Sequence, residues 1–438
     1  MKTRGKILFA VCIVLAFVSI ALPRDFVRVA SYNIKFLRTT VVNQGDRLDK
    51  LKKVIELLDA DVIGLNEIDD RAALELLFPP AQWNIVIDDA SGDDQDLALV
   101  AKKDSLKVIN HRFLFPNAQD DTPFPNRRDL LCVDLQLAAT NIGFSVMVTH
   151  AKSRLGGRSS TDARREGASV KIVNAIQQDF DDKDFILLGD FNDNPDDRSM
   201  NILETGDPNA IGGPEEMDGP LLINLMDHLC AEGRVSHGRT ASDVVGGKIN
   251  TIDPLSRSRN NLARGTDANT GDILFDQMLF PVGMSDKYVA GSVKIFDDEI
   301  AVKGSGDNVA SDHLPVFAEF VFLISEPGAP APTGIKIVAL LPNPAGPDDG
   351  KEEVTIGNFQ TTDLNLTGFT LRDKANNTFP LAGMVPALGK LTIVMTSNSM
   401  PLNNNGDEVT LLDPQGTPKD KVSYTAANAQ SGKVINSP

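Results

Sequence analysis

Short polar motifs close several apolar runs of this sequence, and their side chains are of types that bind cations and transfer protons. The clearest motif is ILLGDFNDNP (Ile186–Pro195), where an apolar run reaches Gly189 and an acid and an amide follow. Alternate residues of an extended chain point to one side, so Asp190 and Asn192 are expected to reach one pocket while Phe191 packs behind. Because an Asp after a strand often only forms a turn, this motif alone does not establish function.

Polar residues lie at or near the ends of apolar runs in five other segments. They are Asn33, Glu67, His150, Asp276 and the adjacent pair Asp312 and His313. Asp276 is expected in the middle of its strand, and Asp312 and His313 directly before theirs. A hard divalent cation takes oxygen ligands from carboxylates and amides, and it keeps positions open for water and phosphate. Glu67 with Asn33 and Asp312 suits such a cation. The two histidines and a second acid remain to handle protons.

The apolar periodicity predicts elements that bring these strand ends together. A strand at Phe26–Phe36, a helix at Asp46–Leu58 and a strand within Asp61–Asp69 form the opening unit. Further strands are predicted at Trp83–Ile87, Leu97–Ala101, Leu131–Leu137, Phe144–His150, Phe185–Leu188, Ile273–Phe280 and Ser311–Phe322. A helix with Ala168, Ile172, Ala175 and Ile176 on one stripe returns the chain to the Ile186 strand.

Three stretches have less regular patterns. Asp196–Met217 is polar and rich in turn residues, and Leu221–Leu229 resembles a short helix. Arg234–Gly271 has little periodicity and many small and basic residues. We interpret it as a long surface insertion.

Arginines gather after His150, on the way to the second predicted helix: Arg154, Arg158, Arg164 and Arg165. They could grip a phosphate-bearing substrate, or they could form a solvated face that offsets nearby acids, and the sequence leaves both alternatives open. The remaining histidines match no motif and are interpreted as loop or surface residues: His111, His228 and His237.

The 438-residue chain is long enough for two or three domains. It begins with three basic residues within its first six positions, and an apolar stretch follows from Ile7 to Leu22. Together with small residues near Ala21, this pattern predicts a signal peptide at residues 1–21 and a secreted or periplasmic protein with no stable membrane span after cleavage. The alternative is a single membrane anchor, for which the run is slightly short.

Removal of the signal takes three positive charges from a net charge of −17 and leaves −20. An acidic protein is not expected to attract nucleic acid over a broad surface, so phosphate binding would depend on metal and local arginines. After cleavage Cys132 and Cys230 remain, which could pair or lie as two small core residues. We favour the second alternative, because Cys132 lies in an apolar strand pattern.

The composition changes at a proline-rich linker, residues 325–334, which contains EPGAPAPT. Short alternating strands recur beyond it at Ile335–Leu341, Glu353–Asn358, Thr367–Leu371, Lys390–Met395 and Glu408–Leu412. This pattern predicts an all-β sandwich of about a hundred residues.

The motifs, in this order, resemble those of the endonuclease/exonuclease/phosphatase superfamily, which includes the DNase I-like nucleases. The resemblance is carried by SYNIKF, IGLNEI, GDFND, FDQML and SDHLPV. It implies that residues 26–324 form an α/β two-sheet sandwich with its site at the strand ends. It also implies a Mg²⁺-dependent phosphoric ester hydrolase, with Mn²⁺ or Ca²⁺ as alternative ions.

The resemblance further implies roles around the metal. Glu67 would be the main magnesium ligand, and Asp312 and Asn33 would help to complete the metal shell. Asp190 and Asn192 would align or deprotonate the attacking water.

Roles at the phosphate follow from the same resemblance. His313 would contact the scissile phosphate and would be oriented by Asp276. His150 would donate to the phosphate or to the leaving oxygen. Arg128 and Arg154 are candidate contacts to substrate phosphate, with Arg128 the weaker match to the family.

The segment after the linker resembles a lamin-tail domain, placed at residues 335–430. The resemblance is carried by LTGFTLRD (Leu366–Asp373), NNNGDEVTLLDPQG and the terminal DKVSY. It implies an immunoglobulin-like sandwich, and its binding to a surface, polymer or partner is an expectation by analogy.

Three functions are compatible with these motifs. The first is a secreted phosphodiesterase that cuts nucleic acid, DNA or RNA, as an endonuclease. The second keeps the chemistry but acts on a phospholipid, phosphoinositide or sphingomyelin head group. The third is a non-catalytic binding protein, which the complete set of motifs disfavours. Nucleic acid is weakly favoured over lipid, because Arg234–Gly271 contains no aromatic residue for a membrane surface.

Overall fold

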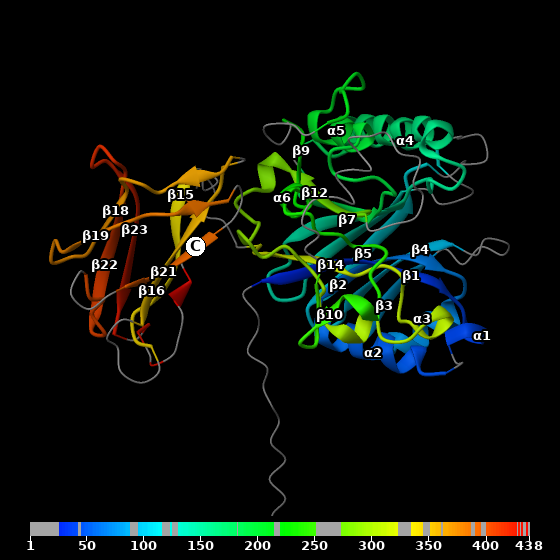
Figure 1. Cartoon of the computed structure of the whole chain (residues 1–438), viewed down its shortest axis with the longest axis horizontal. Coiled ribbons are helices and arrows are strands. Elements are labelled where there is room, and N and C mark those ends of the chain that lie inside the picture. The colour runs from blue at the N-terminus through cyan, green and yellow to red at the C-terminus, as the bar shows by residue number, and fades with distance from the viewer. Residues whose placement is uncertain are drawn as a thin grey trace, which may run out of the picture.

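The protein was analysed as a computed structural model that describes most of the chain. The described residues are 26–42, 45–87, 95–115, 123–124, 130–181, 183–213, 220–250, 273–322, 334–344, 351–360, 362–386, 390–395, 400–426, 428–429, 431 and 435–436. The predicted signal peptide, nearly all of the predicted linker and Arg128 lie outside these residues. An α/β part is followed along the chain by an all-β part (Figure 1).

The α/β part contains two mixed sheets of six strands each, which confirms the predicted two-sheet architecture. The first sheet has the order β13 (Lys294–Ile295), β14 (Val316–Phe320), β1 (Val27–Leu37), β2 (Val62–Ile68), β4 (Asp96–Lys102) and β3 (Trp83–Ile87). The second has the order β5 (Leu106–Phe113), β6 (Leu131–Leu137), β7 (Gly143–His150), β8 (Phe185–Asp190), β12 (Asp276–Pro281) and β9 (Leu222–Asn224).

Helices cover the outer faces of both sheets (Figure 1). The first sheet is flanked by α1 (Thr39–Val42), α2 (Arg47–Leu58) and α3 (Arg71–Leu77), and the second by α4 (Arg158–Asp179) and α5 (Arg198–Thr205). The apolar stripe of α2 packs into the main core, and that of α4 packs into a second cluster outside the other sheet. The helical spacing in the sequence therefore identified the buried faces of α2 and α4.

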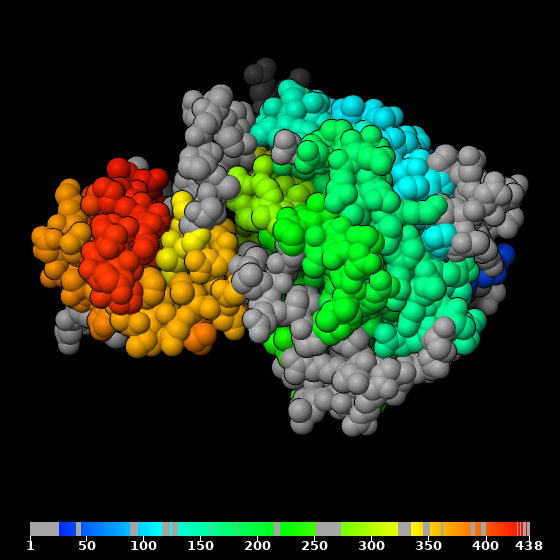
Figure 2. All heavy atoms as spheres, turned by 90° about the horizontal axis from the view of Figure 1, so that it is seen from above, coloured from blue at the N-terminus to red at the C-terminus, as the bar shows by residue number. Residues whose placement is uncertain are grey.

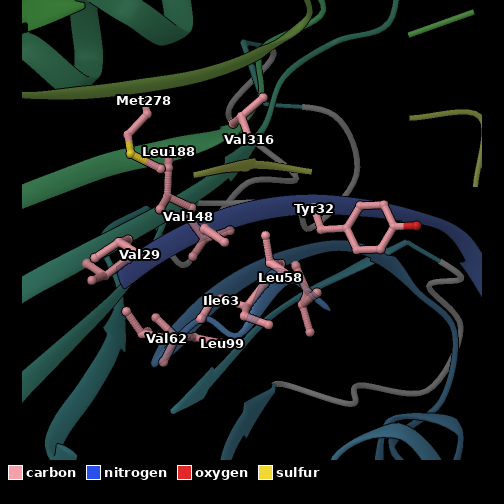
Figure 3. Packing of buried hydrophobic residues seen from close by; sticks show 14 of the residues in the cluster. Val29, Tyr32, Leu58, Val62, Ile63, Leu99, Val148, Leu188, Met278 and Val316 are labelled. Carbon is pink, nitrogen blue, oxygen red and sulfur yellow. The ribbon is translucent and has the colours of Figure 1, made fainter. Parts of the chain in front are cut away.

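The two sheets pack face to face with little space between them. Figure 3 shows Val148, Leu188 and Met278 on one side of β1, with Leu58, Val62 and Leu99 on the other. A Cβ atom added at Gly64 in β2 would lie 2.2 Å from Leu188 Cδ1. This contact explains why wholly apolar runs form the central strands, since both of their faces are buried.

Strand register brings three of the predicted site residues into one row. β7 and β8 are parallel and pair His150 with Asp190, while β8 and β12 are antiparallel and pair Asp190 with Asp276. In the first sheet, β1 and β2 are parallel and pair Asn33 with Asn66, the neighbour of Glu67. Residues far apart in sequence therefore meet at one end of the sandwich.

Gly189 is required by the close approach of β8 to β7. Its φ is 142°, and an added Cβ would lie 2.0 Å from the carbonyl oxygen of Thr149. We expect Gly189→Ala to lower the free energy of unfolding by roughly 2–5 kcal/mol, because it combines backbone strain with a clash against backbone. Gly143→Ala is the matched control, since its Cβ would be 3.6 Å from the nearest atom and should change stability by about 0.5 kcal/mol. Urea unfolding measures the free energy of unfolding of both variants. Equal values for Gly189→Ala and Gly143→Ala would contradict the expectation.

The structure corrects four details of the sequence interpretation. Asp276 begins its strand, and Ile273 forms only an isolated bridge before it. Leu221–Leu229 is not one helix, because β9 occupies Leu222–Asn224 before α6 (Asp227–Ala231). The polar stretch after Pro195 contains α5, and β5 was not predicted. The unpredicted β5 is mostly exposed or half-buried and forms by pairing with β6, which a local apolar pattern does not reveal.

The all-β part contains two four-stranded sheets, as expected. One has the order β21 (Lys390–Met395), β16 (Glu352–Asn358), β15 (Ile335–Leu341) and β24 (Ile435–Asn436), and the other has β19 (Thr378–Pro380), β18 (Thr370–Arg372), β22 (Gly406–Leu412) and β23 (Pro418–Thr425). A third pair joins β17 (Leu364–Asn365) to β20 (Met384–Val385). Side chains from these strands form their own core. In Figure 2 the all-β part, coloured orange and red, lies to one side of the α/β part.

Two further observations concern the whole described chain. Cys132 and Cys230 are both buried and are not joined by a disulfide, which confirms the interpretation of two small core residues. Within the described ranges, the helices are too short or too polar to traverse a lipid bilayer.

Candidate active site

A compact group of ligand atoms lies where the central strands end. One ligand atom from each of Glu67, His150 and Asp190 lies within 4.8 Å of the other two. His150 Nε2 is 3.9 Å from a Glu67 oxygen and 3.6 Å from Asp190 Oδ2. The Asn33 amide nitrogen bridges the two carboxylates, donating to Glu67 Oε1 at 3.1 Å and to Asp190 Oδ2 at 3.0 Å. We name these four residues the acid cluster.

The acid cluster has the composition of a cation site. The Asp190 side chain is 3% exposed and that of Glu67 is 15% exposed, so two carboxylates face each other away from bulk water. In the described part of the chain, Glu67 and Asp190 form their ion pairs with histidines. Oxygen-rich, partly enclosed acids of this kind fit a divalent cation, because uncompensated buried charge is unfavourable.

His313 joins the acid cluster to a second buried acid. Its Nδ1 is 2.8 Å from Asp276 Oδ2, and its Nε2 is 3.7 Å from Asp190 Oδ2. Burial by itself would lower the pKa of His313, but the carboxylates of Asp276 and Asp190 outweigh it and raise the pKa to about 10. The two carboxylates therefore favour the charged imidazole at neutral pH.

Asp190 is the carboxyl group at the centre of this arrangement. Its burial raises its pKa above the usual range, although the charge of His313 acts in the opposite direction. Its backbone N–H donates to Asn66 Oδ1 at 3.1 Å, and the Asn66 amide donates to the Thr149 carbonyl at 2.9 Å. Asn66 thus connects β2 to the ends of β7 and β8 and holds Asp190 in place.

Backbone strain is concentrated at the site. Four of the seven non-glycine residues with positive φ in the described ranges lie here: Lys35, Phe36, Glu67 and Asn192. Such conformations cost about 1–3 kcal/mol each and persist where surrounding structure holds them. At Glu67, φ is 61°, so the residue that carries a ligand carboxylate is itself held in a rare conformation.

Asn192 lies beside Asp190, as expected, and its side chain is anchored to the backbone after β7. Its side-chain amide donates to the Ala151 carbonyl at 3.2 Å, and its backbone N–H donates to Asp190 Oδ1 at 2.9 Å. The left-handed conformation of Asn192 breaks the alternation of an extended strand. Phe191 packs into the second cluster, as predicted.

The structure groups the predicted metal ligands differently from the sequence interpretation. Asp312 is outside the Glu67–His150–Asp190 set; its Oδ2 is 3.2 Å from Lys35 Nζ, and its side chain is 41% exposed. Burial would raise the pKa of Asp312, but His313 and Lys35 outweigh it and lower the pKa. The Asn33 oxygen accepts from the Lys35 N–H at 2.9 Å, so Asn33 presents its nitrogen to the acids.

Arg154 is buried rather than solvated or free for substrate, although it does offset nearby acids as the second alternative proposed. Its side chain is 0% exposed and pairs with Asp193 at 2.9 Å and with Asp197, while Nε donates to the Asn192 carbonyl at 2.8 Å. Arg165 is equally buried and pairs with Asp193 at 2.7 Å. Burial would lower the pKa of Arg154, but Asp193 and Asp197 raise it. These ion pairs hold the loop after Asp190.

Arg154→Met should therefore act on stability. We expect the free energy of unfolding to fall by about 3–5 kcal/mol, because Asp193 and Asp197 would be left buried without one of their partners. Arg71→Met, which breaks an exposed pair with Glu75, is the control and should cost about 1 kcal/mol or less. Chemical unfolding tests both. Normal stability of the Arg154→Met variant together with a raised KM would restore the substrate-contact interpretation.

Two site residues lay in the segment taken for a surface insertion. Ser236 is fully buried and its hydroxyl donates to Asp276 Oδ2 at 2.7 Å. The ring of His237 lies 4.7 Å from that of His313, so its assignment as an ordinary surface histidine was wrong. Nothing local in the sequence marked either residue, since both reach the site through pairing with Ile273 and Asp312–Leu314.

Comparisons with known proteins agree with this architecture. The family model described as "Endonuclease/Exonuclease/phosphatase family" matches residues 37–319, and the "Lamin Tail Domain" model matches residues 328–426. No curated protein matches the chain.

Several solved structures are similar to the chain at low identity. TDP2 of D. rerio complexed with a single-strand DNA product is 16% identical, with 68% of this chain and 99% of that chain covered and a TM-score of 0.46. The human Nocturnin catalytic domain with bound sulfate is 16% identical, with 68% and 94% covered and a TM-score of 0.44. The Bacteroides thetaiotaomicron mannosyl-6-phosphatase is 15% identical, with 68% and 100% covered and a TM-score of 0.44.

Proposed function

Because the chain belongs to the endonuclease/exonuclease/phosphatase family, with a lamin-tail domain after it, we propose that this phosphoric ester hydrolase is a metal-dependent phosphodiesterase that cuts nucleic acid as an endonuclease. The observation that carries the proposal is the Asp276–His313 pair, 2.8 Å apart, facing the acid cluster. A charged imidazole beside a set of cation ligands is the arrangement that a phosphodiester in the course of hydrolysis requires.

Mg²⁺ is the proposed cation, and when bound it would neutralise negative charge that builds up on the phosphoryl oxygens. Glu67 is the proposed principal ligand, joined by Asp312 once the cation competes with Lys35 for its carboxylate. Asn33 holds the carboxylates of Glu67 and Asp190 close together, because its amide nitrogen donates a hydrogen bond to each.

The protein's own side chains would then handle protons and phosphate. Asp190, whose pKa is raised by burial, orients the attacking water and accepts its proton. His313 contacts the scissile phosphate, held by Asp276. His150, on the adjacent strand, donates to the phosphate or to the leaving oxygen.

A plasmid-relaxation assay and cleavage of a labelled single-stranded oligonucleotide test the proposal. The purified protein should convert supercoiled plasmid to nicked circles with Mg²⁺ and should do nothing in EDTA. A lipid head-group release assay is run beside it. Head-group release without cleavage of nucleic acid would contradict the proposal, as would no turnover of either substrate.

One observation favours a phospholipid-type substrate as the second candidate. Leu155, in the loop that follows His150, is 72% exposed. An exposed aliphatic residue near the site is what binding at a lipid surface would use. The same head-group assay, with Leu155→Ser as the variant, distinguishes this candidate, because only lipid turnover should fall.

The proposal also covers export of the protein and a binding role for its lamin-tail domain. The basic and apolar first 21 residues support a signal peptide and hence a secreted or periplasmic protein. The lamin-tail domain is proposed to bind a surface, polymer or partner, since it has a core of its own and carries none of the proposed site residues.

A further inference from the structure

Phe36 has a backbone conformation that bulky residues rarely adopt. Its φ is 46°, and that of Lys35 before it is 52°. The two residues interrupt the pairing of β1 with β2 between Asn33 and Leu37. Left-handed backbone at a bulky residue is strained, and such strain gathers at sites where function maintains it.

The ring of Phe36 does not belong to the hydrophobic core. It is partly buried, yet in the described part of the chain it is neither a member of the three apolar clusters nor among the side chains packed against them. Other partly buried phenylalanines, such as Phe113, Phe115 and Phe317, do pack against a cluster. The strain at Phe36 is therefore not explained by core packing.

The surroundings of Phe36 place it at the acid cluster and beside a cation. Its backbone N–H donates to Glu67 Oε2 at 3.3 Å. The guanidinium carbon of Arg38, which also pairs with Asp69, lies 5.9 Å from the centre of the ring. Lys35, the preceding residue, reaches Asp312 at 3.2 Å. An aromatic ring with basic residues close to it in the chain is thus next to the carboxylate assigned to the cation.

We propose that the Phe36 ring stacks on a nucleobase of the nucleotide next to the scissile phosphate, and that Lys35 and Arg38 face the strand's phosphates. This inference rests on the proposed function and specifies its substrate as a strand with an unpaired base at that position. Single-strand binding sites combine aromatic platforms with basic side chains in this way, because every base offers a flat face and every nucleotide a charge.

The test uses the full-length protein and the Phe36→Gly variant. Glycine accepts a positive φ without strain, so the variant should melt at or above the temperature of the wild type. Steady-state cleavage is measured on a single-stranded DNA oligonucleotide and on one with abasic residues flanking the cleaved bond. On the normal strand, the variant should raise KM by about 5- to 150-fold, the loss of one base stack, with kcat changed by about twofold or less.

A second substrate and two more variants test whether the change in KM comes from stacking. On the abasic strand, wild type and Phe36→Gly should have equal KM, and Phe36→Trp should keep the low KM on the normal strand. Ile109→Ala is the control, because Ile109 is 58% exposed on β5 and touches no proposed site residue that the structure describes. It should behave as the wild type.

The outcomes separate this inference from the function on which it rests. A wild type that cleaves neither strand overturns the proposed function and this inference with it. A wild type that cleaves while Phe36→Gly has an unchanged KM overturns the stacking inference alone. An equal rise in KM on the normal and the abasic strand also overturns the stacking inference. So does a large drop in the melting temperature of Phe36→Gly, which would make Phe36 a structural residue.

Discussion

Replacing His313 with alanine will lower kcat by about 100- to 10,000-fold on any phosphodiester that the protein cleaves. His313 lies between two acids, with Nδ1 2.8 Å from Asp276 Oδ2 and Nε2 3.7 Å from Asp190 Oδ2. Its loss removes the donor proposed for the scissile phosphate. Steady-state kinetics with Mg²⁺ measures the change.

The fold should survive this substitution. Asp276 keeps its hydrogen bond from Ser236, so we expect the free energy of unfolding to fall by about 1–3 kcal/mol, less than the stability of a typical domain. His313→Asn is the control for structure, because its amide can still donate to Asp276 but cannot act as an imidazolium. The two variants should be equally inactive and the Asn variant more stable. Full activity in either would refute the role of His313.

Glu67→Ala should abolish turnover through loss of the metal. We expect kcat/KM to fall by about 1,000-fold or more, because the proposed cation loses its principal ligand and charge on the phosphoryl oxygens is no longer neutralised. Calorimetric titration with Mg²⁺ or Mn²⁺ should show the lost binding directly. This readout does not depend on knowing the substrate.

Stability distinguishes a ligand from a structural acid at Glu67. Glu67→Gln keeps the shape but removes one of two facing negative charges, so the metal-free variant should melt no lower than the wild type. Glu75→Gln, on the exposed face of α3, is the matched control and should bind metal and turn over normally. A Glu67→Gln protein with unaltered metal affinity would remove Glu67 from the site.

The motif residues were predictable because their signals are local. An apolar run that ends in an acid, amide or histidine marks a buried strand and the polar residue at its end, as at Glu67, His150 and Asp190, and His313 is marked by the strand that follows it. The element types around them followed from periodicity in the same way, as at α2 and β3. Both rest on a few neighbouring residues, which a sequence displays directly.

The partners of those residues were not predictable. Arg154 looked equally suited to substrate and solvent, and only its burial against Asp193 and Asp197 shows that it holds a loop. His237 looked like a surface residue until pairing with distant strands brought it to His313. A side chain's environment is set by segments far along the chain, and no local pattern encodes it.

The amino-acid sequence by itself determined the family, the order of the two domains and the motifs whose residues meet at the site, because each is written in short contiguous stretches. Only the tertiary structure decided which of them touch: that Asp190 lies between His150 and Asp276, that Asp312 pairs with Lys35, and that Phe36 is strained outside the core. The physical reason is that strand order, register and the close packing of two sheets are properties of the whole folded chain.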